Sequence, residues 1–273
     1  MAYSNFKPTV WSKFIQTELE KKCRLVEDCW TQFEGEAKQG ARVKILGVTA
    51  PEIFDYVAGE GIPAPTTIEG TSVQLDIDQA KAFNFMIDDI DRAQSVDGLM
   101  ETLIKEVTAK MAKTRDSFIA NLAQNAENMS PSTSVTTPED AKKMVDDALL
   151  MLREHDVDIE DEVTITVSPF FYQLFRDALT EIKTNNDELI KKGVVGMYDN
   201  CKVKLSNNLY NDGTDDYLIV KTDKAVAFAS GLDQMEAYRP QNLFSDAVRG
   251  LNTFGGRVVR PKELYIIKAH YAD

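Results

Sequence analysis

The sequence has few of the residue types on which most enzyme sites depend. Its 273 residues include two histidines, His155 and His270, and neither stands in a context that suggests a base or a metal ligand. No GxxxxGK[ST] or GxGxxG motif occurs, so Gly250, Gly255 and Gly256 are interpreted as turn or bulge residues. We therefore expect no enzyme: no catalytic, cofactor-binding or metal site, and no cofactor.

Cysteine is also scarce, and the 31 basic residues are outnumbered by 44 acidic ones. Cys23, Cys29 and Cys201 are an odd number and are interpreted as reduced thiols. The net charge of −13 argues against tight nucleic-acid binding, because that affinity comes mainly from Lys and Arg displacing counterions from phosphates. No apolar run approaches the roughly 20 residues that span a bilayer, so no membrane association is expected.

Acidic residues gather at Asp88, Asp89 and Asp91 and again between 154 and 162. Calcium is conceivable there, because hard cations take several carboxylate oxygens. Neither group fits the EF-hand loop, which needs a glycine at its sixth position and a glutamate at its twelfth. Solvated acidic loops are the favoured interpretation.

The composition, with 43% hydrophobic and 27% charged residues, is that of a folded globular protein. Near the N-terminus, Trp11, Ile15 and Leu19 repeat at four-residue spacing with Phe14 beside them, which predicts a short amphipathic helix. This helix could pack on its own domain or on a neighbouring chain, and the sequence favours neither.

Two predicted strands, at 43–46 and 73–77, flank a long tip from 47 to 70 that is rich in glycine and proline. A structureless loop of more than about 20 residues is uncommon inside a compact domain. A hairpin that reaches onto another subunit would cover its apolar groups; a lid folded on its own domain is the alternative. These groups are Ile53, Phe54, Tyr56, Val57 and Ile62.

The remaining sequence predicts an α+β fold of mixed element order. One long helix is expected from about 96 to 126, because glycine and proline are absent after Gly98. Thr137 and Pro138 then give an N-cap and first-turn signal for a second helix to about 154. The other expected elements are strands at 163–167, 203–205, 217–220, 225–229 and 258–267 and a helix from 169 to 179.

Residues 225–269 resemble the C-terminal segment of major capsid proteins with the Hong Kong 97 fold, particularly those of prophages in low-GC Gram-positive bacteria. The strand pair, the helix beginning SVDGLMETLIKE, TITVSPFFYQLF and GVVGMYDNCKVKLSNNL agree with the order of that family, so the resemblance covers nearly the whole chain. It implies four parts. They are an N-terminal arm at 1–35, an extended β-hairpin loop (E-loop) at 36–80, a peripheral domain with a long spine helix at 81–135 and 236–273, and an axial domain at 136–235.

The resemblance implies a structural coat protein that self-assembles through pentamers and hexamers into an icosahedral head shell enclosing phage DNA, without sequence-specific DNA binding. A separate scaffolding protein and a portal are the implied partners, and the implied location is the virion capsid, assembled in the bacterial host cytoplasm. An encapsulin-like compartment and a soluble acidic enzyme with a lid loop are the alternatives. The residues predicted to contact neighbouring copies are Trp11, Phe14, Ile15, Ile53, Phe54, Tyr56, Val57 and Ile62.

The chain departs from the family at two places. Asn200 and Cys201 stand where relatives often have glycine and a bulky apolar residue, but asparagine tolerates positive φ, so the turn is expected to survive. The tip from 47 to 70 has no lysine, and only Lys44 and Lys81 lie near its base. We therefore do not expect the lysine–asparagine cross-link that some members form.

Overall fold

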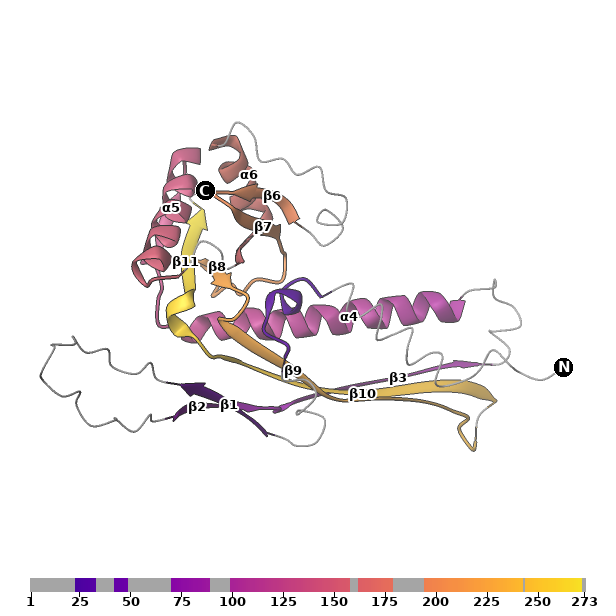
Figure 1. Cartoon of the computed structure of the whole chain (residues 1–273). Helices are drawn as coiled ribbons and strands as arrows, with labels where there is room; N and C mark the ends of the chain where they lie inside the picture. The colour runs from indigo at the N-terminus through magenta and orange to yellow at the C-terminus, as the bar shows by residue number, and fades with distance from the viewer. Residues whose placement is uncertain are drawn as a thin grey trace, which may run out of the picture.

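The computed structural model describes residues 23–32, 42–48, 70–88, 99–157, 162–178, 194–242 and 244–271. It is an elongated α+β subunit, with a three-stranded sheet and a long helix at one end and a six-stranded sheet with two helices at the other (Figure 1). No helix among the described residues is long and apolar enough to cross a membrane.

The elongated part consists of the three-stranded antiparallel sheet, in the order β3-β10-β9, and the helix α4 that runs along one face of it (Figure 1). On this face, Phe118 of the helix packs edge-on against Phe254 with ring centroids 5.4 Å apart. The elements are β3 (Gln79–Asp88), α4 (Leu99–Leu122), β9 (Val226–Tyr238) and β10 (Ser245–Val258), with a 3-10 turn, η2 (Ala123–Asn125), after the helix. The predicted long helix is confirmed.

The compact part is a mixed sheet in the order β4-β11-β8-β5-β7-β6, in which β4–β11 and β5–β7 are parallel pairs. All of β5 is buried, and the core includes Phe171 and Phe175 of the short helix α6. The elements are β4 (Thr133–Val135), α5 (Pro138–Glu154), β5 (Val163–Val167), α6 (Pro169–Ala178), β6 (Val194–Tyr198), β7 (Cys201–Leu205), β8 (Asp216–Thr222) and β11 (Leu264–Tyr271). Five of these were predicted from the sequence: α5, β5, α6, β7 and β8.

Helix α5 begins at the predicted cap. The Asp140 amide donates to Thr137 Oγ1 at 3.3 Å, and the Thr137 amide donates back to Asp140 Oδ2 at 3.1 Å. This reciprocal pair satisfies two amides that a helix start otherwise leaves without partners. Pro138, which has no amide hydrogen to satisfy, takes the first helical position.

Replacing Thr137 with alanine is expected to lower the free energy of unfolding by about 1 kcal/mol, the usual cost of losing such a cap. Urea unfolding of the unassembled subunit would measure it. Thr114→Ala is the control, because the exposed Thr114 hydroxyl only donates to the Lys110 carbonyl within its own helix. An equal loss in both variants would contradict the role of the cap.

The turn between β6 and β7 forms although Asn200 and Cys201 differ from the residues that the resembling family often has there. Tyr198 pairs with Cys201, and the two residues between them, Asp199 and Asn200, have φ of 47° and 65°. Positive φ at both central positions is typical of the two-residue hairpin turn whose twist matches the strands, and aspartate and asparagine tolerate it. The expectation for Asn200 is confirmed.

The C-terminal region differs from the prediction in two ways. The single strand expected at 258–267 is wrong: β10 ends at Val258, and η3 (Pro261–Glu263) separates it from β11. Proline has a fixed φ and no amide hydrogen to offer a ladder, so the chain turns there and passes to the other sheet. The glycines at 250, 255 and 256 lie inside β10, not in a turn, and the register shift in this strand falls between Asn252 and Phe254.

The strand pairing links segments on both sides of the domain boundary expected near 236. β11, expected in the peripheral part, pairs with β8 and β4 in the six-stranded sheet. β9 begins at Val226, inside the range expected for the axial part, and belongs to the three-stranded sheet. Each sheet therefore takes strands from both sides of the expected boundary near 236.

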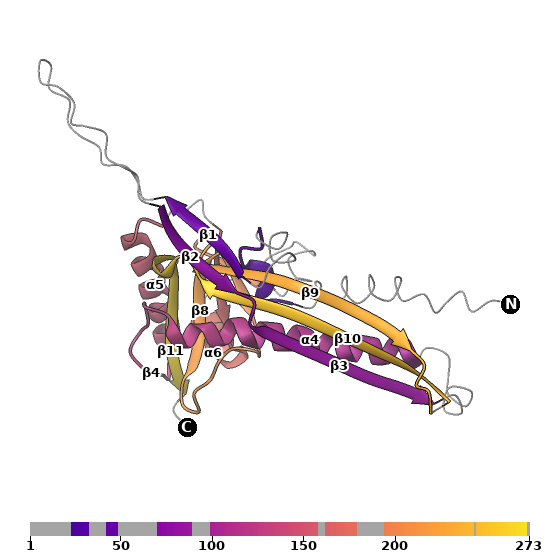
Figure 2. The same ribbon diagram turned by 90° about the horizontal axis from the view of Figure 1, so that it is seen from below.

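The predicted strand pair forms an antiparallel hairpin of β1 (Arg42–Val48) and β2 (Gly70–Asp76), which is a separate two-stranded sheet. It lies across one end of β9 and β10 (Figure 2). A small core holds its base, in which Val43, Ile45 and Leu75 pack with Ala227 and Ala229 of β9. Since Phe228, between these alanines, packs with the α4 core, the hairpin base and α4 cover opposite faces of the sheet.

Candidate assembly surfaces

The eight residues predicted to contact neighbouring copies lie outside the described residues. They are Trp11, Phe14, Ile15, Ile53, Phe54, Tyr56, Val57 and Ile62. Their contacts therefore remain predictions, and candidate surfaces are drawn from the residues that the structure describes.

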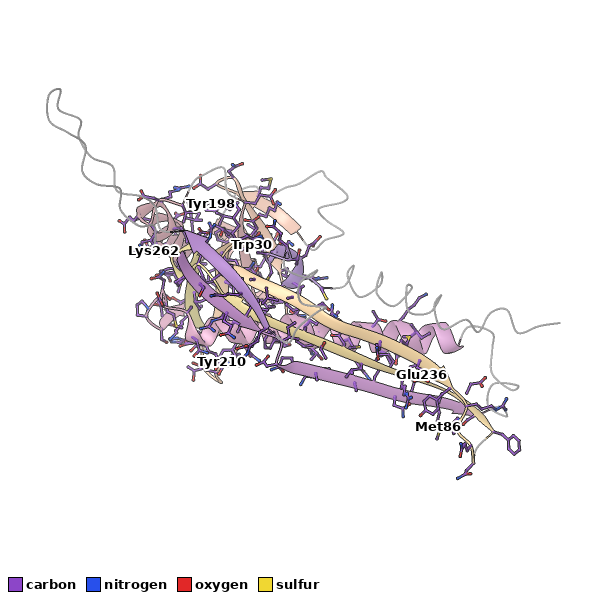
Figure 3. The ribbon with its side chains drawn as sticks, turned by 60° about the horizontal axis from the view of Figure 1, so that its bottom comes forward. Trp30, Met86, Tyr198, Tyr210, Glu236 and Lys262 are labelled. Carbon is purple, nitrogen blue, oxygen red and sulfur yellow. The ribbon has the colours of Figure 1, made fainter. Side chains whose placement is uncertain are left out.

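The far end of the three-stranded sheet exposes large apolar side chains. Phe244 is 81% exposed and Met86 is 60% exposed. Ser245 pairs with Asp88 and Ala247 with Met86, so Phe244 at the start of β10 lies beside the end of β3. We call Met86 and Phe244 the distal tip; Figure 3 shows Met86 at the end of the sheet remote from the six-stranded sheet. A largely exposed phenylalanine beside an exposed methionine is typical of a surface that another protein covers.

Ordered polar groups lie next to the distal tip on the face of the sheet opposite α4. Arg249 donates to Glu236 Oε2 from Nε at 3.0 Å and from Nη2 at 2.6 Å, and its guanidinium lies 5.0 Å from the centre of the Tyr238 ring. The Tyr238 hydroxyl accepts from Asn84 Nδ2 at 3.1 Å. An apolar end with a polar surround is the arrangement found in protein–protein interfaces.

Residues 23–30, which we call the clasp, lie where the two sheets meet. Asp116 of α4 accepts hydrogen bonds from the backbone amides of Arg24 at 3.1 Å and Leu25 at 3.0 Å. Asp116 is almost fully buried, and this burial raises the pKa of its carboxyl, while the backbone hydrogen bonds from the clasp oppose that rise. The carboxylate thus fixes the start of η1 (Val26–Asp28) against the long helix.

The clasp also binds strands of both sheets. Lys204 of β7 lies with Nζ 2.6 Å from Asp28 Oδ1, and Lys221 of β8 donates to the Asp28 carbonyl. The Trp30 amide donates to the Val226 carbonyl of β9 at 2.8 Å. Buried charges are tolerated only when paired, so these lysines depend on the clasp. The clasp therefore joins α4 and strands of both sheets, and it lies between residues 1–22 and the hairpin along the chain.

One group of described residues has the residue types of a catalytic triad but not its geometry. Ser132, Asp215 and His270 meet, but the serine at 3.2 Å and the aspartate at 2.9 Å both contact the same ring nitrogen, Nδ1. A catalytic triad needs the serine on the other ring nitrogen. No group of three or more metal-ligating side chains is found among the described residues. Of the acidic residues between 154 and 162, the structure describes 154–157 and 162.

The three cysteines, all within the described chain, are buried and form no disulfide, which confirms the expected thiols. Burial raises the pKa of Cys201 to about 11 and also raises the pKa of Cys29. Both thiols are therefore protonated at neutral pH, and a protonated thiol is a poor nucleophile.

Sequence reasoning missed both the distal tip and the clasp. A signal for the clasp exists, because Asp116 stands four residues after Ala112 and three before Ile119, on the apolar side of a predicted helix. A signal for the distal tip is the apolar Phe244, which follows the turn-forming residues Pro240 and Asn242. Neither signal identifies the group that it meets.

Comparison with solved structures finds a similar fold over most of the chain. A structure from Mycobacterium phage Che8 is 27% identical, with a TM-score of 0.71, and covers 89% of this chain and 90% of its own. The capsid of Ralstonia phage GP4 (TM-score 0.69, 12% identity, 89% and 86% coverage) and that of cyanophage P-SCSP1u (0.68, 15%, 85% and 84%) are similar in fold. No protein-family model matches the sequence, and the search of curated proteins finds no match.

Proposed function

We propose that this chain, a major capsid protein of the tailed-phage type with the Hong Kong 97 fold, assembles with copies of itself into the icosahedral head shell of a phage. The observation that carries the proposal is the likeness to the Che8 structure over about nine tenths of both chains. The exposed distal tip supports it, because apolar groups of that size gain stability when a neighbour covers them, at about 25 cal/mol per Å².

In the shell, α4 is the spine helix of a peripheral part that contains the three-stranded sheet, and the six-stranded sheet is the axial part. The arm before the clasp and the hairpin after it reach neighbouring copies. Trp11, Phe14 and Ile15 of the arm, and the apolar residues of the tip from 47 to 70, are the proposed contacts. Repetition of modest contacts around rings of five and six copies stabilises the particle, although ordering and lost rigid-body freedom offset much of each gain.

Negative-stain electron microscopy of the purified chain tests the proposal. Closed particles are expected, either spontaneously or after addition of a separate scaffolding protein. A chain that stays a small oligomer in both conditions, by size-exclusion chromatography and microscopy, would contradict it. That result would favour a soluble acidic enzyme in which residues 47–70 form an active-site lid.

Phe54→Asp is expected to reduce the yield of closed particles at least ten-fold, because a charge replaces an apolar group that a neighbour would bury. Particle counts by electron microscopy measure the effect, and circular dichroism checks that the subunit is folded. Thr66→Asp, at a polar position of the same tip, is the matched control and is expected to assemble. Closed particles of Phe54→Asp at the yield of the unmodified chain would remove Phe54 from the interface.

The further partners are proposed from the family resemblance. A portal would join the shell at one vertex, and DNA would be enclosed without sequence-specific contacts, as suits a net charge of −13. We place assembly in the bacterial host cytoplasm and the product in the virion capsid. We propose no catalytic activity for the subunit.

An encapsulin-like compartment has a related fold and would use similar surfaces, but the likeness to phage capsids favours the head shell. The neighbouring genes distinguish the two. Portal, terminase and protease genes are expected beside a head protein. A cargo enzyme with a docking peptide is expected beside a compartment protein.

A further inference from the structure

The direction of the β1–β2 hairpin is not set by a backbone ladder. Within the described residues, β1 and β2 pair only with each other, whereas every other strand belongs to one of the two larger sheets. The chain passes from β2 into β3 through Ile77 and Asp78, so these two residues connect the hairpin to the three-stranded sheet. The angle between hairpin and sheet therefore depends on packing at this link.

At that link the hairpin backbone lies directly on β10. A Cβ atom added at Gly255 would lie 2.1 Å from the Asp76 carbonyl oxygen and 2.9 Å from Ile77 Cα. Real Cβ atoms do not approach backbone atoms that closely, and backbone atoms cannot rotate away as the end of a side chain can. A side chain at this position would therefore force the Asp76–Ile77 backbone and β10 apart.

Neighbouring groups hold the Asp76–Ile77 backbone in place over Gly255, at what we call the crossing. Arg257, two residues along β10, donates from Nη1 to the Gln74 carbonyl of β2 at 3.0 Å. Ile77 covers Gly231 of β9, where an added Cβ would lie 3.3 Å from Ile77 Cγ2. The buried Val43, Ile45 and Leu75 complete the contact from the hairpin side. The hairpin is thus seated in one orientation, and Gly255 is the point of closest approach.

We propose that Gly255 is a positioning residue for assembly: it sets the angle at which the hairpin leaves the subunit, and through that angle the place where the hairpin meets a neighbouring copy. This inference rests on the proposed shell function and goes beyond it. Each hairpin strand has seven residues, or about 23 Å at 3.3 Å per residue. A tilt of about 10° at the crossing would move its outer end by about 4 Å, enough to separate apolar groups in contact.

Gly255→Ala tests the angle in unassembled subunits. Spin labels on Ser72→Cys of β2 and Gln234→Cys of β9, both exposed positions, report the distance between hairpin and sheet by pulsed electron paramagnetic resonance. The three native cysteines are buried and should label poorly. We expect the distance distribution to shift by several ångströms in Gly255→Ala.

Gly250→Ala is the matched control on the same strand. Its added Cβ would meet the Phe83 ring at 2.4 Å, a side chain that can move, and the hairpin link is not among its contacts. We expect it to leave the labelled distance unchanged. If Gly255→Ala fails to fold, Arg257→Ala, which removes only the exposed bond to the Gln74 carbonyl, is expected to broaden the distribution.

Assembly supplies the second measurement. We expect Gly255→Ala to give at least five-fold fewer closed particles of the original diameter, and Gly250→Ala to retain them. If the unmodified chain forms particles and Gly255→Ala matches it in distance, yield and diameter, the positioning role is wrong and the shell function stands. If the unmodified chain forms none under any condition, the proposed function itself fails, whatever the labels show.

Discussion

Phe244→Asp is expected to lower the yield of closed particles at least ten-fold and to leave the unfolding of the isolated subunit unchanged. The side chain is 81% exposed, so its replacement removes almost no packing within the subunit. In a shell, a covered aromatic side chain is a typical hot spot worth about 2 kcal/mol or more, and the loss recurs in every copy. A buried carboxylate without a partner adds a desolvation cost.

The measurement is a particle count by electron microscopy, together with thermal unfolding of unassembled subunits. Gln241→Asp is the matched control, because it adds the same charge at an exposed position of the same turn. Phe244→Leu keeps an apolar group and is expected to retain much of the yield. Unchanged yields in Phe244→Asp would show that the distal tip stays open to solvent in the particle.

Asp116→Ala should have the largest effect on the subunit itself, lowering the free energy of unfolding by about 2–4 kcal/mol. The variant leaves the buried amide of Leu25 and the partly buried amide of Arg24 without their acceptor, and an unsatisfied buried polar group costs about 1–3 kcal/mol. A decrease in Tm of roughly 5–10 °C is expected for the unassembled subunit. Glu106→Ala, an exposed carboxylate on the same helix, is expected to change the Tm little.

Asp116→Asn separates the hydrogen bonds from the charge. The amide oxygen still accepts from the clasp, so a smaller loss than in Asp116→Ala is expected. Burial raises the pKa of Asp116, so the folded state keeps its proton at a pH where the unfolded chain has released it. The part of the stability that is linked to this proton is therefore present in acid and is lost as pH rises through the folded pKa, separately from the hydrogen bonds that Asp116→Ala removes. Asparagine should remove that part of the pH dependence; identical pH profiles would contradict a raised pKa.

The elements that local sequence determines were predicted well. Thr137 and Pro138 specify a helix start through groups that are adjacent in the sequence, and the observed cap is the expected one. The second strand of the hairpin followed from the alternating pattern of residues 73–77, and the turn at Asn200 followed from its tolerance of positive φ. In each case the deciding contacts lie within a few residues or depend on a conformational preference of one residue.

The errors arose where the deciding contact is remote in sequence. Gly255 was interpreted as a turn or bulge residue, yet it pairs with Ala229 within a strand. A side chain is excluded there by the Asp76–Ile77 backbone, which lies nearly 180 residues earlier in the chain. Asp116 likewise gains its role from amides about 90 residues away. No local pattern contains such partners, so the clasp and the crossing could not be predicted from residue spacing.

The position of β11 has a consequence for synthesis of the protein. This strand lies between β4 and β8, so the ribosome must complete residues 264–271 before the six-stranded sheet can close. At typical rates of translation, β4 waits on the order of 10 s for this partner. Nascent and prematurely terminated chains thus lack a finished sheet. A shell that incorporates only subunits with a complete six-stranded sheet would exclude such chains without any dedicated quality-control factor.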